Sequence, residues 1–124
     1  MSKTRSTTDA NRTHPGYQYV TTAADVEEYV LKRNGMRVLY LHRPDTGVVT
    51  TNITYRVGAR DEARGETGLA HMLEHMLFKP TTYDRQQGFS DGGAMRFERD
   101  TGCILNANTW KDRTTYYFSY PREF

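Results

Sequence analysis

The sequence has few of the features that mark a specialised class of protein. Its single cysteine, Cys103, excludes an internal disulfide and is compatible with a reducing compartment. The N-terminus has no long apolar run, so we expect neither a secretory signal nor a transmembrane helix and predict a cytoplasmic protein. Asp9 interrupts any basic amphipathic face in the first sixteen residues, which argues against a mitochondrial targeting segment.

Charge and length set further limits. The formal net charge is +2, and Arg and Lys are spread along the chain. This balance argues against nucleic acid or an anionic membrane as the main partner. At 124 residues, 36% of them hydrophobic, the chain can form at most one small domain with a modest core. Residues 1–20 begin with a polar stretch rich in Ser, Thr and Arg and are predicted to be a disordered tail, followed by a folded segment over residues 21–124.

Short segments of strand character predict an antiparallel sheet. The segments cover residues 27–32, 36–42, 48–57, 103–109 and 114–120. The first two flank Asn34-Gly35, a pair typical of a two-residue turn in which both residues take a positive φ. Residues 48–57 alternate between apolar and polar, which is typical of a strand with one buried face.

Residues 68–78 have the spacing of an amphipathic helix. Residues three and four apart share a face of a helix, and this segment has two such stripes. One is apolar and suited to a core: Leu69, Met72, Leu73 and Met76. The other carries the remaining histidine, acidic and aromatic side chains: His71, Glu74, His75 and Phe78.

The ends of this helix also have recognisable signals. Acidic residues precede it, where the helix dipole favours negative charge: Asp61, Glu62 and Glu66. Thr67 is the expected cap at the start, and Lys79-Pro80 the expected end. Residues 81–101 are polar and contain three glycines, so we expect a long loop with at most one short helical turn.

The second stripe of the helix resembles half of a hydrolytic metal site. His71 and His75, at i and i+4, can both direct an imidazole nitrogen at one cation. Neutral imidazoles are good zinc ligands, and Glu74 beside them can take a proton from a zinc-bound water. The alternative is a pair of surface histidines with no metal. The separation of this stripe from the apolar one favours the metal site.

Two longer stretches, YRVGARDE at 55–62 and GLAHMLEHMLFK at 68–79, resemble the pitrilysin/insulinase family of zinc peptidases, the inverzincins. The similarity extends upstream to residues 31–39 and downstream to residues 106–110 and 114–117. The family includes mitochondrial processing peptidases and related bacterial enzymes. The resemblance identifies residues 21–124 as the N-terminal portion of such a peptidase domain. The expected fold is α+β, with a largely antiparallel sheet and the H-x-x-E-H helix packed on one face of an incomplete domain.

The resemblance also implies roles for individual residues. His71 and His75 match the two histidine ligands of Zn²⁺, and Glu74 matches the general base that activates water. The expected activity is that of a metalloendopeptidase acting on peptide or unfolded protein. A second peptidase-like domain or subunit is the expected protein partner.

A downstream stretch matches the family's substrate-binding strand. Asn106 and Ala107 correspond to the edge on which the substrate backbone adds as an extra antiparallel strand. Asn108 corresponds to a position near the pocket for the residue after the scissile bond. Without the resemblance, residues 105–108 would be interpreted as an ordinary strand with polar side chains.

The chain also departs from the family pattern. The family's third zinc ligand is a glutamate further along than Phe124, and Pro80 stands where the family usually has glycine. We therefore expect this chain alone to bind zinc poorly, to hydrolyse peptides little and to be prone to aggregation. One alternative is a non-catalytic family member or fragment that serves as a peptide-binding or assembly subunit. Another is a metal-responsive binding module without hydrolysis.

Overall fold

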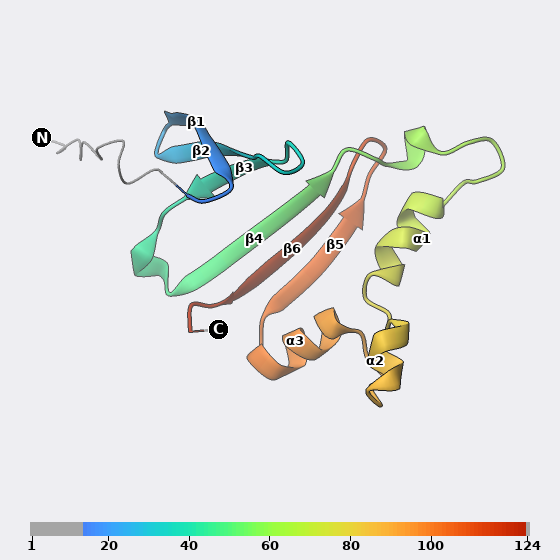
Figure 1. Cartoon of the computed structure of the whole chain (residues 1–124). Helices are drawn as coiled ribbons and strands as arrows, with labels where there is room; N and C mark the ends of the chain where they lie inside the picture. Colours follow the sequence, from blue (N-terminus) through green and yellow to red (C-terminus); the bar gives the residue numbers. More distant parts are fainter. Residues whose placement is uncertain (1–13, 124) are drawn as a thin grey trace, which may run out of the picture. The chain divides into compact units, whose positions relative to one another are not determined.

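The computed structural model describes residues 14–123, and its internal contacts divide the chain into two units at Asp45. Each unit contains a three-stranded antiparallel sheet, and the helices lie in the second unit (Figure 1). The α+β expectation is therefore confirmed, although the strands form two sheets rather than one. Among residues 14–123, no helix combines the length and apolar character needed to span a bilayer.

The first unit is a meander of β1 (Tyr17–Ala23), β2 (Val26–Leu31) and β3 (Arg37–Leu41). The predicted tail is wrong in its boundary, because residues 17–20 belong to β1; residues 1–13 lie outside the described residues. Tyr29 of β2 is buried and donates a hydrogen bond from its hydroxyl to Glu27 Oε2 at 2.6 Å. The apolar centre of this unit is therefore a tyrosine with its polar end satisfied.

The prediction of a two-residue turn at Asn34-Gly35 is wrong, and such a pair of positive φ values occurs in the other connection of this meander. Positive φ values at two successive residues occur at Ala24 (48°) and Asp25 (67°), between β1 and β2. In the second connection only Gly35 has a positive φ, 73°. The Leu31 N–H donates to the Met36 carbonyl at 2.8 Å, so the loop contains residues 32–35 rather than two residues. Asn34 instead accepts a hydrogen bond from Met36 N–H through its side chain.

The sheet of the second unit has the order β4-β6-β5. Its strands are β4 (Val48–Tyr55), β5 (Ile104–Thr109) and β6 (Thr114–Pro121). Central β6 contains the buried residues 114–116, and Tyr116 packs edge-to-face on Tyr55 with ring centroids 6.0 Å apart. The prediction of a buried face on β4 is wrong, because all of its residues are exposed. The principal helix contacts are to β5 and β6 instead.

Three α-helices and two short 3-10 turns complete the chain within residues 14–123. The turns are η2 (Pro44–Thr46) and η3 (Ala59–Asp61); the helices are α1 (Leu69–Met76), α2 (Thr82–Gln86) and α3 (Gly93–Thr101). The predicted long loop over residues 81–101 is therefore wrong. A reciprocal cap begins α2: Thr81 Oγ1 accepts from Asp84 N–H at 3.1 Å, and Asp84 Oδ2 accepts from Thr81 N–H at 2.8 Å.

Asp84 also joins α2 to α3. Arg96 Nη2 donates to Asp84 Oδ1 at 2.6 Å, and Arg96 Nη1 donates to the carbonyl of Asp91 at 2.6 Å. The guanidinium lies 4.0 Å from the centre of the Phe89 ring. Hydrogen bonds from the Thr81 hydroxyl and backbone N–H, then from Arg96, lower the pKa of the Asp84 carboxyl to about 2. The segment between these two helices is thus fixed by one buried carboxylate.

This depressed pKa predicts acid sensitivity. An ordinary aspartate has a pKa of about 3.9, so the stabilisation from ionised Asp84 is complete above that pH and lost as pH falls through about 2. The melting temperature should therefore fall between about pH 4 and pH 2. Thermal unfolding across this range measures the effect. Asp84→Asn should lose this part of the pH dependence, whereas Asp112→Asn, at an exposed site, should keep it. Parallel profiles for wild type and Asp84→Asn would contradict the assignment.

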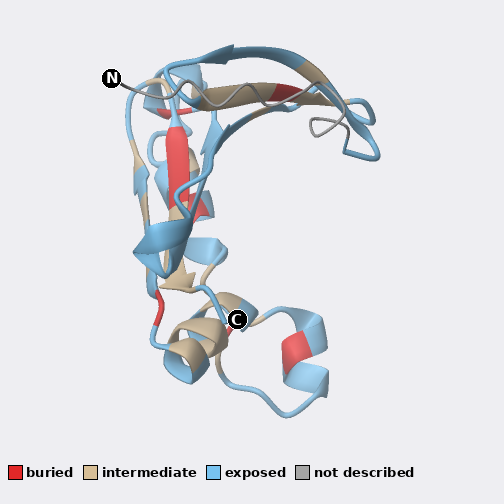
Figure 2. Ribbon diagram, turned by 90° about the vertical axis from the view of Figure 1, so that its left-hand side faces the viewer, coloured by how far each residue is buried: buried red, intermediate tan, exposed pale blue. Residues whose placement is uncertain are grey.

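Little of the described chain is buried (Figure 2). No described side chain has less than 2% of its surface exposed. The apolar stripe of α1 that was predicted to be core is exposed at every position: Leu69, Met72, Leu73 and Met76. In α1 the buried residue is Glu74, 7% exposed, because it is this side of the helix that contacts β5.

Candidate metal centre

The start of α1 is held by a carboxylate from the preceding loop. Glu62 Oε2 accepts a hydrogen bond from Gly68 N–H at 2.8 Å, and Glu62 Oε1 accepts one from Ala70 N–H at 2.9 Å. These bonds satisfy two backbone donors that a helix start leaves without partners. The prediction that Thr67 caps the helix is wrong, because Gly68 occupies the cap position and no side chain caps from it. Glu62, one of the expected acidic residues, caps the helix start instead.

His71 and His75 face each other on an exposed side of α1. Their Nε2 atoms are 3.0 Å apart and their ring centroids 4.6 Å apart. Two nitrogens on a tetrahedral zinc with ordinary bond lengths are about 3.3 Å apart, so a small rotation of the rings would suit this pair to one ion. The described residues contain no group of three or more His, Cys, Asp or Glu side chains able to hold a metal. The donor set therefore fits two ligand positions of a zinc ion.

One carboxylate oxygen of Glu74 is bonded to the sheet rather than to the histidine pair. Its Oε2 accepts a hydrogen bond from the Thr109 hydroxyl, on β5, at 2.5 Å. Phe78, just after α1, approaches Tyr116 of β6 with ring centroids 6.5 Å apart. Burial raises the pKa of Tyr116, and the nearby negative charge of Glu74 raises it further, followed by Tyr55. Glu74 therefore places a carboxylate between the helix and the sheet.

The predicted substrate residues lie on an edge strand. The order β4-β6-β5 leaves β5 paired on one side only within the described sheet. Asn106 and Asn108 are exposed, and Ala107 between them is partly buried. Ala107 N–H donates to Asn106 Oδ1 at 2.8 Å, so one backbone donor of this strand is bonded to a side chain. Glu74 and Thr109 connect this strand to α1.

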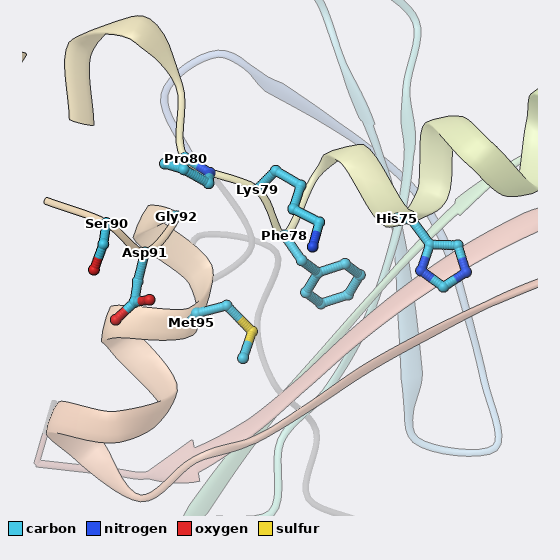
Figure 3. A pocket seen from close by; sticks show the side chains of 8 residues that line it. All are labelled: His75, Phe78, Lys79, Pro80, Ser90, Asp91, Gly92 and Met95. Atoms are coloured by element: carbon cyan, nitrogen blue, oxygen red, sulfur yellow. The ribbon is translucent and has the colours of Figure 1, made fainter. Parts of the chain in front are cut away.

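A cavity of about 340 Å³ lies next to His75 (Figure 3). Its lining comes from the end of α1, the segment after it, the residues just before α3, and α3 itself: His75, Phe78, Lys79, Pro80, Ser90, Asp91, Gly92 and Met95. Gly92 permits the close approach, because a Cβ there would lie 2.6 Å from the Phe78 carbonyl oxygen and 2.7 Å from that of Lys79. Asp91 is paired with Arg99 Nη1 at 2.6 Å.

Comparison with known proteins assigns the chain to a family. Residues 37–123 match the family described as Insulinase (peptidase family M16). This chain belongs to the insulinase family. The match covers β3 and the whole of the second unit up to residue 123, and so includes α1 and β5. The resemblance to pitrilysin/insulinase peptidases is thereby confirmed.

Individual insulinase-family relatives are zinc proteases and processing peptidases by name. The zinc protease PqqE of Helicobacter pylori is 38% identical over 91 residues, which are 73% of this chain and 19% of that protein. A probable mitochondrial-processing peptidase subunit beta of Schizosaccharomyces pombe is 34% identical over 100 residues, 81% of this chain and 21% of that protein. The chain thus spans about a fifth of the length of these curated relatives.

A solved structure has a similar fold. The crystal structure of a protease from Helicobacter pylori superposes with a TM-score of 0.62 at 30% sequence identity, over 88% of this chain and 23% of that one. The names of the relatives support zinc as the cofactor of the insulinase family.

Sequence reasoning overlooked one contact of this insulinase-family site. Thr109 follows the predicted substrate residues directly, and the sequence predicts for it only the end of a strand. Alternation along β5 places Thr109 on the same face as Leu105 and Ala107. The available signal was that the Thr109 hydroxyl lies on the face of β5 opposite to Asn106 and Asn108. Its partner, Glu74, could be identified only once β5 was located beside α1.

Proposed function

We propose that this chain supplies the first two zinc ligands and the general base of a metalloendopeptidase. The observation that carries the proposal is the 3.0 Å approach of His71 Nε2 and His75 Nε2 on the exposed side of α1. Membership of the insulinase family, whose relatives are named zinc proteases, supports the same chemistry. The inferred reaction is hydrolysis of a peptide bond.

Each residue then has a defined part in the reaction. His71 and His75 would hold the metal through their Nε2 atoms. Zinc, when bound, supplies a Lewis acid that lowers the pKa of a water molecule toward neutrality. Glu74 would take a proton from the attacking water and pass it to the leaving amine. The proximity of Glu74 to the histidines in the helix, and its bond to Thr109, support this division of roles.

We infer that the substrate is an extended peptide or unfolded protein that pairs with β5. A strand edge recognises backbone, so it binds chains of varied sequence in an extended conformation. Binding exchanges the Asn106 Oδ1 contact at Ala107 N–H for a substrate carbonyl. Asn108 then lies near the substrate residue that follows the scissile bond. In this arrangement α1 lies across one face of the sheet, and a second peptidase-like domain or subunit covers the bound peptide.

Zinc titration tests the metal assignment. Wild-type chain should bind Zn²⁺ weakly, since two histidines are fewer than the three protein ligands of a typical catalytic site. His71→Ala and His75→Ala should each lose measurable binding, because a single imidazole remains. His42→Ala, in the other unit, should bind as wild type does. Competition with a chromophoric chelator measures the affinity, and binding that survives His75→Ala would contradict the site.

A non-catalytic peptide-binding member of the family is the second candidate. It is favoured by one observation, that β5 is paired on one side only within the described sheet and can add a peptide strand whether or not a metal is bound. In that case a peptide should bind β5 equally well with and without a chelator. Fluorescence anisotropy of a labelled unfolded peptide, with and without EDTA, separates the two candidates.

A further inference from the structure

We infer that Thr109 is a positioning residue, which holds the Glu74 carboxylate away from the metal and so keeps it available as a base. The inference rests on the proposed function and assigns a role to a residue outside the ligand set. A hydrogen bond 2.5 Å long joins Thr109 Oγ1 to Glu74 Oε2. It links β5 to the buried residue of α1.

The hydroxyl protons in this region can be assigned by elimination. Thr109 Oγ1 has two neighbours, Glu74 Oε2 at 2.5 Å and Thr114 Oγ1 at 3.4 Å. Thr114 donates its own proton to the Val57 carbonyl at 3.0 Å. Thr109 is therefore free to donate its single proton to Glu74, and a carboxylate can only accept. The distance is in the range of hydrogen bonds between a hydroxyl and a charged carboxylate.

The bond matters because the carboxylate has a competing partner. Glu74 is one residue before His75 and three after His71 on the same helix, so its flexible side chain starts close to the zinc position. Carboxylate oxygens are themselves good zinc ligands. A carboxylate bound to the metal is a weaker base for water, because the cation stabilises its negative charge. Among residues 14–123, the Thr109 bond is the only hydrogen bond to this carboxylate.

Zinc affinity distinguishes a positioning role of Thr109 from a merely structural one. Loss of a structural contact would leave the affinity unchanged or weaken it, whereas release of Glu74 should strengthen it. Thr109→Val keeps the shape of the side chain and removes the hydroxyl, and should bind Zn²⁺ about tenfold more tightly because Glu74 joins the histidines. Thr109→Ser should match wild type. Adding Glu74→Gln to Thr109→Val should cancel the gain. Thr114→Val removes a neighbouring buried hydroxyl that bonds the Val57 carbonyl, and should leave the affinity unchanged.

A second measurement needs no metal. In chain labelled with ¹³C at glutamate carboxyls, the Glu74 resonance should move in Thr109→Val and stay in place in Thr109→Ser. Thr109→Ala serves as a second hydroxyl-free variant if valine prevents folding. Zinc affinity equal to or weaker than wild type in both hydroxyl-free variants, or an unmoved Glu74 resonance, overturns the inference.

The outcomes also separate this inference from the proposed function. If His75→Ala leaves zinc binding intact, the metal site itself is wrong and the role of Thr109 is overturned with it. If His75→Ala abolishes binding but Thr109→Val and Thr109→Ala do not tighten it, the metal site stands and only the positioning role fails.

Discussion

Replacing Glu74 by glutamine is expected to remove peptide hydrolysis while zinc binding stays at the wild-type level. Glutamine has nearly the same size, and its carbonyl oxygen can still accept the hydrogen bond from Thr109. An amide cannot take a proton from water near neutral pH. Because general base catalysis contributes about 10²- to 10⁴-fold, kcat should fall by at least about a hundredfold with little change in KM.

The assay is cleavage of a quenched fluorogenic peptide, alongside zinc titration of the same variant. Glu66→Gln, an exposed acid before α1, is the matched control and should retain full turnover. Wild-type kcat in Glu74→Gln would exclude Glu74 as the base. Loss of zinc binding in that variant would instead identify Glu74 as a ligand, and the peptide-binding candidate predicts no turnover to lose.

Alanine at Gly92 is expected to destabilise the second unit by about 3 kcal/mol, at the upper end of the range for overpacking. The new Cβ would lie 2.6 Å from the Phe78 carbonyl oxygen, 2.7 Å from that of Lys79 and 2.9 Å from the Lys79 carbonyl carbon. These are backbone atoms of the segment after α1, so no side chain can rotate away to make room. The segment has to move, and the cavity beside His75 should change shape with it.

The neighbouring glycine is the matched control. At Gly93 the nearest atom to a new Cβ is Arg96 Nη2 at 3.8 Å, and the residue is the first of α3. Gly93→Ala should therefore be neutral or stabilising, by at most about 1 kcal/mol, because alanine favours the helix. Urea unfolding of both variants measures the contrast. Equal effects at positions 92 and 93 would refute the steric explanation.

The strands β2 to β6 and the H-x-x-E-H helix could be predicted because their signals are local, whereas β1 was not predicted. Alternation over Val48–Tyr55 and the four-residue spacing of His71 and His75 depend only on neighbours in the sequence. The same holds for β2 and β6. The helices α2 and α3 were overlooked because the Thr81–Asp84 cap is short and polar, and the carboxylate of Asp84 finds Arg96 only after both helices exist.

Burial was less predictable because it depends on what covers each face. Leu73 has the pattern of a core residue yet is 64% exposed, whereas Glu74, a charged residue, is 7% exposed. The difference is set by which side of α1 meets β5, and that requires the pairing of strands far apart in sequence. Glu62 illustrates the same limit, since charge near a helix start was expected but its two hydrogen bonds to Gly68 and Ala70 depend on the loop's path.

The hydrogen bond from Ala107 N–H to Asn106 Oδ1 has a consequence for the selectivity of the strand edge. A donor that already has a partner gains little enthalpy from any single new acceptor, so a stray contact with another protein brings almost no net attraction. A chain that pairs with β5 over several residues binds more strongly, since each additional backbone hydrogen bond adds to the binding free energy. Under the proposed function, Asn106 therefore disfavours short pairings more than long ones, and amide hydrogen exchange at Ala107 should slow most with peptides that match several residues of β5.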